Sequence, residues 1–143
     1  MLRGISTVSF FADDVATASA WYGEVLGADA YFVREMGGSL VYAEFRIGDL
    51  QQELGIVDSR FAPGGAPGKP GGAILYWHVD DVRAAAERLV ALGATTFEPV
   101  TERGPGFVTA SVVDPFGNVL GVMENAHYLE VLAALRLDRD AAR

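Results

Sequence analysis

The stretch Phe11-Ala12-Asp13-Asp14-Val15 returns 67 residues later, in related form, as His78-Val79-Asp80-Asp81-Val82. Each stretch begins where a short segment rich in apolar and aromatic residues ends. These segments, at 5–11 and 73–79, have a composition that is typical of β-strands. Both precede a helical pattern that stops at a Leu-Gly-Ala sequence, at 26–28 and 92–94. The chain is therefore predicted to contain an internal repeat of a strand, a capped helix and a glycine stop.

Both predicted helices carry start and stop signals. Asp14 and Asp81 stand where a carboxylate can accept the unpaired N–H groups of a first helical turn. Gly27 and Gly93 stand where a left-handed residue closes a helix. Between these signals the apolar residues share one helical face: Val15, Ala18, Tyr22, Val25 and Leu26 in the first helix, and Val82, Ala85, Ala86, Leu89 and Leu92 in the second.

Three more strand-like segments follow each helix, at 29–35, 39–47 and 50–57 and then at 95–100, 107–113 and 118–124. Each half then has the order strand, helix, strand, strand, strand, so the predicted fold class is α+β. A last helical pattern covers 126–137, with Tyr128, Val131, Leu132 and Leu135 on one face. That helix packs on its own domain or covers a subunit interface, and the tail after it is expected to fray.

This pattern predicts a single domain over 1–143 with internal divisions. The first module takes 1–61, a linker 62–72, the second module 73–125, and a C-terminal helix and tail 126–143. Eight of the eleven residues at 62–72 are glycine or proline, which supports neither a helix nor an inner strand. We interpret this segment as a linker, with a mobile lid over a pocket as the alternative.

Composition narrows the classes of partner. Nineteen acidic residues against eleven basic ones give a net charge of −8, and Lys69 is the only lysine. Without a basic cluster, nucleic acids and anionic membrane surfaces are not expected partners. The absence of cysteine excludes disulfides, thiolate metal sites and cysteine nucleophiles. No apolar run approaches the ~20 residues of a membrane span, and no signal-peptide pattern opens the chain, so we expect a cytoplasmic protein.

Three motifs on this repeat resemble the vicinal oxygen chelate superfamily, which includes glyoxalases, bleomycin-resistance proteins and extradiol dioxygenases. They are Asp14 followed by Trp21-Tyr22 and Val25-Leu26-Gly27, then Val79-Asp80-Asp81-Val82 followed by Leu92-Gly93-Ala94, and finally Asp114-Pro115-Phe116-Gly117-Asn118. The resemblance covers nearly the whole chain. It implies two βαβββ modules whose curled mixed sheets surround a cleft, with a C-terminal helix added.

The resemblance also implies four positions that hold a divalent metal ion in the metal-dependent members of the family. In this chain they are Thr7, Glu53, Ile74 and Gly121, and only Glu53 is a plausible ligand. A divalent ion needs about four to six N or O donors, so we expect no metal and no other cofactor. A relocated metal site is the alternative, built from Glu53 and His78 with Glu44 or Glu124.

Strand alternation around these positions predicts which side chains line the cleft. Glu53 is the candidate catalytic residue, because a carboxylate facing a partly apolar cleft can act as a general base or bind a cationic or hydroxyl-bearing ligand. The predicted ligand-binding residues are Thr7, Ser9, Phe11, Gln51, Glu53, Ile74, Tyr76, His78, Gly121 and Met123.

Three functions follow from this interpretation. The first is a metal-free binding protein of the glyoxalase/bleomycin-resistance type, which sequesters a small, partly aromatic molecule in the cleft between the modules. The second is a lyase, isomerase or dioxygenase that uses a relocated metal or Glu53 as acid and base. The third is a non-catalytic subunit that interacts through its last helix. The resemblance further implies a homodimer.

Overall fold

The computed structural model describes residues 5–64, 70 and 72–141, with side chains described as far as Arg136. The chain divides into two compact units. The first takes in the chain up to Pro70 together with Pro115–Asn118, and the second takes in Gly71–Asp114 and the chain from Val119. The predicted linker at 62–72 falls partly outside the described residues, at 65–69 and 71, so its role stays a prediction.

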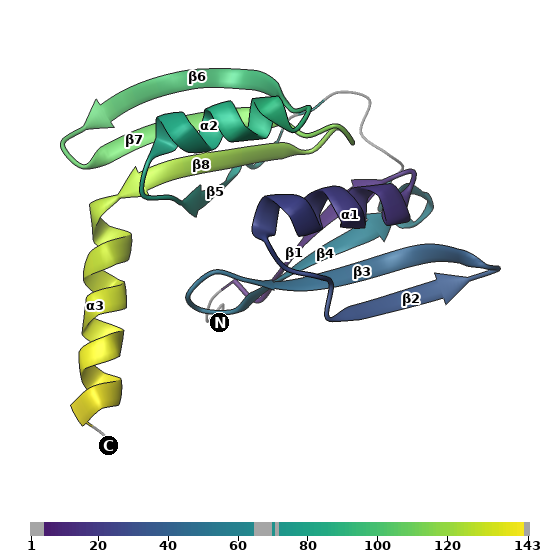
Figure 1. Cartoon of the computed structure of the whole chain (residues 1–143), viewed down its shortest axis with the longest axis horizontal. Helices are drawn as coiled ribbons and strands as arrows, with labels where there is room; N and C mark the ends of the chain where they lie inside the picture. The colour runs from purple at the N-terminus through teal and green to yellow at the C-terminus, as the bar shows by residue number, and fades with distance from the viewer. Residues whose placement is uncertain (1–4, 65–69, 71, 142–143) are drawn as a thin grey trace. The chain divides into compact units, whose positions relative to one another are not determined.

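The first unit is a four-stranded mixed sheet covered on one face by a helix (Figure 1). The strands lie in the order β1-β4-β3-β2, with β1 parallel to β4 and the other neighbours antiparallel. The elements are β1 (Thr7–Ala12), α1 (Val15–Leu26), β2 (Phe32–Met36), β3 (Ser39–Ile47), β4 (Gln52–Asp58) and a 3₁₀ turn, η1 (Ser59–Phe61).

The second unit repeats this plan, with strand order β5-β8-β7-β6 and β5 parallel to β8. Its elements are β5 (Leu75–His78), α2 (Val82–Ala91), β6 (Thr95–Gly104), β7 (Phe107–Val113), β8 (Val119–Asn125) and α3 (Ala126–Ala141), which continues directly from β8 (Figure 1). The predicted α+β class, the two strand–helix–three-strand modules and the C-terminal helix are confirmed. In the part of the chain that the structure describes, no helix is both long and apolar enough to cross a membrane.

The helix signals act as the sequence predicts. The Asp14 carboxylate accepts the Thr17 N–H at 3.0 Å and the Thr17 hydroxyl at 2.7 Å, and Asp81 accepts the Ala84 N–H at 2.9 Å. The bonds from Thr17 hold the pKa of Asp14 below its ordinary value. Gly27 ends α1 in the left-handed region, at φ 65°, where a side chain would be strained.

Each unit has its own core between helix and sheet. In the first unit, Val15, Ala18 and Tyr22 of α1 are buried with Phe10, Ala43, Phe45, Leu54 and Ile56 of the strands. In the second, Val82 and Leu89 of α2 are buried with Ala110, Val112, Leu120 and Val122. Because side chains alternate along a strand, the neighbouring residues of these strands point to the face that no helix of the unit covers.

The Asp-Pro-Phe-Gly-Asn sequence at 114–118 joins β7 to β8, but its last four residues belong to the first unit. The Asn118 side chain accepts the Phe11 N–H at 3.1 Å and donates to the Phe11 carbonyl at 2.9 Å. The Phe116 ring meets Trp21 of α1 edge to face, with centroids 6.0 Å apart. The segment therefore bonds to β1 through the Asn118 side chain and packs on α1 through Phe116.

Candidate ligand-binding site

The face of the first sheet opposite α1, here called the open face, carries polar side chains of β1, β3 and β4. The register places Thr7 beside Glu53, Ser9 beside Gly55, Gly55 beside Glu44, and Glu53 beside Arg46. Of the residues predicted to line a cleft, Thr7, Ser9, Phe11 and Glu53 share this face.

Two glutamates form the centre of the open face. The Thr7 hydroxyl donates to Glu53 Oε2 at 3.0 Å, and the Tyr31 hydroxyl lies 3.4 Å from Glu53 Oε1. Tyr31 also donates to Glu44 Oε1, while the Tyr42 hydroxyl donates to Glu44 Oε2. We call these five residues, Thr7, Tyr31, Tyr42, Glu44 and Glu53, the carboxylate cluster. A single tyrosine hydroxyl thus links its two carboxylates.

Burial and neighbouring charges shift the pKa values of Glu44 and Tyr42 in the cluster. Burial raises the pKa of the Glu44 carboxyl, the charge of Glu53 raises it further, and Arg46 opposes both. Burial, followed by the charge of Glu53, raises the pKa of the Tyr42 hydroxyl, so Tyr42 keeps its proton near neutral pH and can donate.

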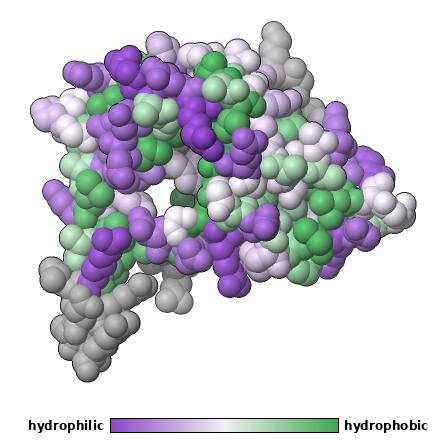
Figure 2. All heavy atoms as spheres, viewed as in Figure 1, coloured by the Kyte–Doolittle hydropathy of each residue, from purple (hydrophilic) through white to green (hydrophobic). Residues whose placement is uncertain are grey.

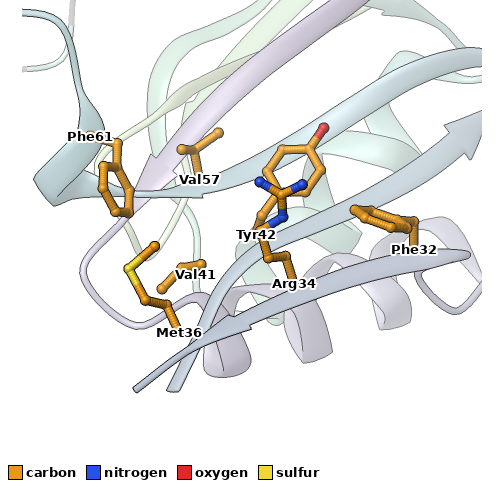
Figure 3. A pocket seen from close by; sticks show the side chains of 7 residues that line it. All are labelled: Phe32, Arg34, Met36, Val41, Tyr42, Val57 and Phe61. Atoms are coloured by element: carbon orange, nitrogen blue, oxygen red, sulfur yellow. The ribbon is translucent and has the colours of Figure 1, made fainter. Parts of the chain in front are cut away.

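An apolar cavity of about 380 Å³ adjoins the cluster and shares Tyr42 with it. Figure 3 shows Phe61 and Met36 at one end of the cavity and Phe32 at the other, with Tyr42 and Arg34 between them. The full lining is Phe32, Arg34, Met36, Val41, Tyr42, Val57 and Phe61. Every residue of β2 is exposed, and Figure 2 shows apolar side chains at the surface where Figure 1 places β2 and β3.

Gly55 leaves room for this arrangement. A Cβ atom at position 55 would lie 2.9 Å from the Tyr42 hydroxyl oxygen and 3.0 Å from a ring carbon of Tyr42. Any side chain there would push Tyr42 away from the sheet and from Glu44. The glycine therefore lets Tyr42 lie flat between the cavity and the carboxylates.

The second unit has a related but separate group on the face opposite α2. Tyr76 donates to Glu98 Oε2 at 3.3 Å and Ser111 donates to the same oxygen at 3.4 Å, while the Arg103 guanidinium lies 3.8 Å from Glu98 Oε1. Burial raises the pKa of Tyr76, Glu98 raises it further, and Arg103 opposes both. Here arginine and glutamate form an ion pair.

His78, one of the predicted ligand-binding residues, organises the start of α3. Its Nδ1 accepts the Asn125 N–H at 3.3 Å, and its ring stacks on Tyr128 with centroids 4.6 Å apart. Its Nε2 is buried, lacks a hydrogen-bond partner among the described residues, and lies 3.9 Å from Asp80 Oδ1. Met123 lies beside His78 in the register, and Ile74 lies just before β5.

Gln51 stands apart from the cluster. It lies in the turn before β4 with a left-handed backbone, at φ 55°, and its side-chain amide donates to the Gly48 carbonyl at 2.9 Å. Glu124, a possible ligand of a relocated metal, points to the α2 side of its sheet, where its carboxylate accepts the Val82 N–H at 3.1 Å.

The donor set that the family's metal would require does not fit these residues. Ile74 and Gly121 offer no donor atom, and a Cβ at position 121 would lie 2.5 Å from Cδ1 of Tyr76. Among the residues that the structure describes, no three histidine or acidic side chains gather as a metal would need. The expectation of a metal-free protein stays a prediction for metal analysis.

Sequence reasoning missed Tyr31, Tyr42 and Arg46, and it considered Glu44 only as a metal ligand. Alternation along β3 places Tyr42, Glu44 and Arg46 on one face, and pairing with β4 sets that face beside Glu53. That signal was present in the sequence. The position of Tyr31 had no such signal, because it lies before β2 and is fixed by its N–H bond to the Glu44 carbonyl, at 2.9 Å.

Comparison with known proteins identifies the family. The sequence model of the Glyoxalase/Bleomycin resistance protein/Dioxygenase superfamily matches residues 4–122, and the chain belongs to this superfamily. No curated protein matches the chain.

Solved structures share the fold. TnmS3, described as an antibiotic binding protein from Streptomyces sp. CB03234, is 25% identical over 85% of this chain and 94% of its own, with a TM-score of 0.62. A glyoxalase-related enzyme from Fulvimarina pelagi is 20% identical over 85% of this chain and 88% of its own, with a TM-score of 0.68. TioX from Micromonospora sp. ML1 is 18% identical over 86% of this chain and 99% of its own, with a TM-score of 0.63.

Proposed function

We propose that this protein binds a small, partly aromatic organic molecule on the open face of its first unit, without a metal ion. The observation that carries the proposal is the apolar cavity of about 380 Å³ joined through Tyr42 to the carboxylate cluster. Small-molecule sites commonly combine such an apolar volume with a few polar groups that fix orientation. Superfamily membership and the likeness to an antibiotic binding protein support the same class of function.

The two parts of the site have different tasks in this proposal. Phe32, Met36 and Phe61 supply exposed apolar area, which gives affinity without strict geometry. The carboxylates of Glu44 and Glu53 accept hydrogen bonds and attract positive charge, which fixes orientation. Covering these exposed apolar side chains with a ligand is favourable, because it removes their apolar area from water.

A titration with 2-naphthylmethanol, followed by amide chemical shifts, tests the proposal. We expect shifts in β2, β3 and β4 and an affinity about tenfold weaker in Met36→Glu, because the ligand would have to desolvate the new charge. Val33→Glu is the matched control: Val33 is an exposed apolar residue of the same strand but is absent from the cavity lining. Equal weakening in both variants, or shifts confined to the second unit, would contradict the proposal.

An acid–base enzyme is the second candidate function, and the raised pKa of Glu44 beside Glu53 favours it.

The metal-free part of the proposal has its own test. Elemental analysis after dialysis against Zn²⁺, Ni²⁺, Mn²⁺ and Fe²⁺ separates it from the metal-dependent enzymes of the superfamily. We expect no stoichiometric metal. A bound equivalent that is lost in Glu53→Ala would overturn the metal-free part of the proposal.

A further inference from the structure

Arg46 makes an unexpected contact on the open face. The register places it directly beside Glu53, yet its guanidinium carbon lies 4.3 Å from the centroid of the Tyr31 ring. The structure thus shows Arg46 stacked on an aromatic ring rather than paired with the neighbouring carboxylate. A cation over the face of a tyrosine ring is attracted by the negative potential of that face.

The same ring belongs to the carboxylate cluster, because the Tyr31 hydroxyl links Glu44 and Glu53. A cation on Tyr31 therefore lies near two carboxylates. The effect reaches Glu44, where the charge of Arg46 partly offsets the rise in pKa that burial and Glu53 cause. Tyr31, Glu44 and Glu53 together offer what a cation needs when it leaves water: an aromatic face and negative charge.

We propose that the ligand of this protein is an organic cation with an apolar or aromatic body, and that Arg46 is an internal cation which the ligand's charged group replaces over Tyr31, beside Glu44 and Glu53. The body of the ligand then extends past Tyr42 into the cavity toward Met36 and Phe61. The inference rests on the proposed function, since it names the ligand class and a specificity-determining residue of the same site.

Arg34 is a second arginine near the site, and it serves as the control for the effect of removing one positive charge. It lines the cavity and pairs with Tyr42 in the register, so it adds a second positive charge to the open face. It does not stack on Tyr31 in the structure. Because Arg34 and Arg46 are both exposed, replacing either removes one positive charge without disturbing the core. Only replacing Arg46 also frees the Tyr31 ring.

The experiment compares two probes of the same shape, 2-naphthylmethylamine (a cation at neutral pH) and 2-naphthylmethanol (neutral), by amide chemical-shift titration. We expect the wild-type protein to bind the cation more tightly. In Arg46→Gln the affinity for the cation should rise about fivefold, and in Arg34→Gln it should rise by a smaller factor. The neutral probe should bind Arg46→Gln with nearly the affinity that it has for the wild type, and Glu53→Gln should weaken binding of the cation by a larger factor than binding of the neutral probe.

Each other outcome has a defined meaning. Equal rises in affinity for the cation in Arg46→Gln and Arg34→Gln would overturn the role of Arg46 as an internal cation, because the change in net charge alone would explain them. No gain in Arg46→Gln, or no preference of the wild type for the cation, would overturn the inference while leaving the proposed function intact. Failure of both probes to bind any of these proteins would overturn the proposed function together with the inference.

Discussion

At the scale of single residues, Glu44 is the group whose ionisation reports on the carboxylate cluster. Its folded pKa lies above the ordinary value of 4.5, so the folded protein holds this proton more tightly than the unfolded chain does. The resulting stabilisation is fully present below the ordinary pKa and is lost as the pH rises through the folded value.

We therefore expect the wild type to lose stability relative to Glu44→Gln as the pH rises from about 4 to about 7. The measurement is the free energy of urea unfolding of each protein across that range. A constant offset between the two is expected as well, because Tyr31 and Tyr42 donate to different oxygens of Glu44, and in glutamine one of these becomes an NH₂ group that cannot accept. Glu35→Gln, an exposed position on β2, serves as the control, and the same slope in both variants would refute the assignment to Glu44.

At the scale of elements, two carboxylates accept N–H groups at the start of α2. The Asp81 carboxylate accepts the Ala84 N–H at 2.9 Å, and Glu124 accepts the Val82 N–H. Asp81→Ala removes the first bond, and we expect the free energy of unfolding to fall by about 1 kcal/mol. Asp81→Asn keeps an acceptor at the cap and should restore most of the loss. Chemical denaturation measures both, and an unchanged stability in Asp81→Ala would show that Glu124 caps the helix alone.

The same scale shows what the sequence predicts well. Helix starts at Asp14 and Asp81 and the strands at 39–47 and 107–113 depend on local signals, namely caps, glycines and alternation, and the structure confirms these elements. The stacking of Arg46 on Tyr31 depends instead on whether its long side chain contacts the Tyr31 ring or the Glu53 carboxylate. No periodicity encodes that contact, so Glu53 and Thr7 were predicted as site residues, whereas Tyr31 and Arg46 were not.

At the scale of the whole molecule, Asn118 belongs to a short segment that lies in the first unit although its neighbours in sequence lie in the second. It lies between two strands of the second unit but bonds to both backbone groups of Phe11 in the first. In Asn118→Ala both bonds are lost, and we expect the first unit to lose about 1–2 kcal/mol of its free energy of unfolding. Asn118→Asp keeps the acceptor for the Phe11 N–H but sets a carboxylate oxygen against the Phe11 carbonyl oxygen, so its cost should be no smaller than that of Asn118→Ala.

The chain offers a direct readout, because its two tryptophans lie in different units, Trp21 on α1 and Trp77 on β5. In a Trp77→Phe background, fluorescence follows the first unit through Trp21, which contacts Phe116. In a Trp21→Phe background it follows the second. If Asn118→Ala shifted only the Trp77 transition, the assignment of 115–118 to the first unit would be wrong.

The internal repeat is visible in the sequence because the two copies keep their caps and glycine stops, which the fold requires of both. Their open faces are under no such constraint, and they differ. The first holds two glutamates around a shared hydroxyl, and the second holds one glutamate paired with arginine. A repeat thus predicts the architecture of both units, but it does not predict the chemistry of either.

The ring of Tyr76 against Gly121 also limits how this scaffold can be redesigned. A designer who wished to install a metal centre would begin by placing a glutamate at position 121, and its first side-chain carbon would meet ring carbons at 2.5–2.9 Å. Tyr76 therefore has to move or be replaced by a smaller residue before a side chain at 121 fits. The same steric conflict would meet any other substitution that adds a side chain at position 121.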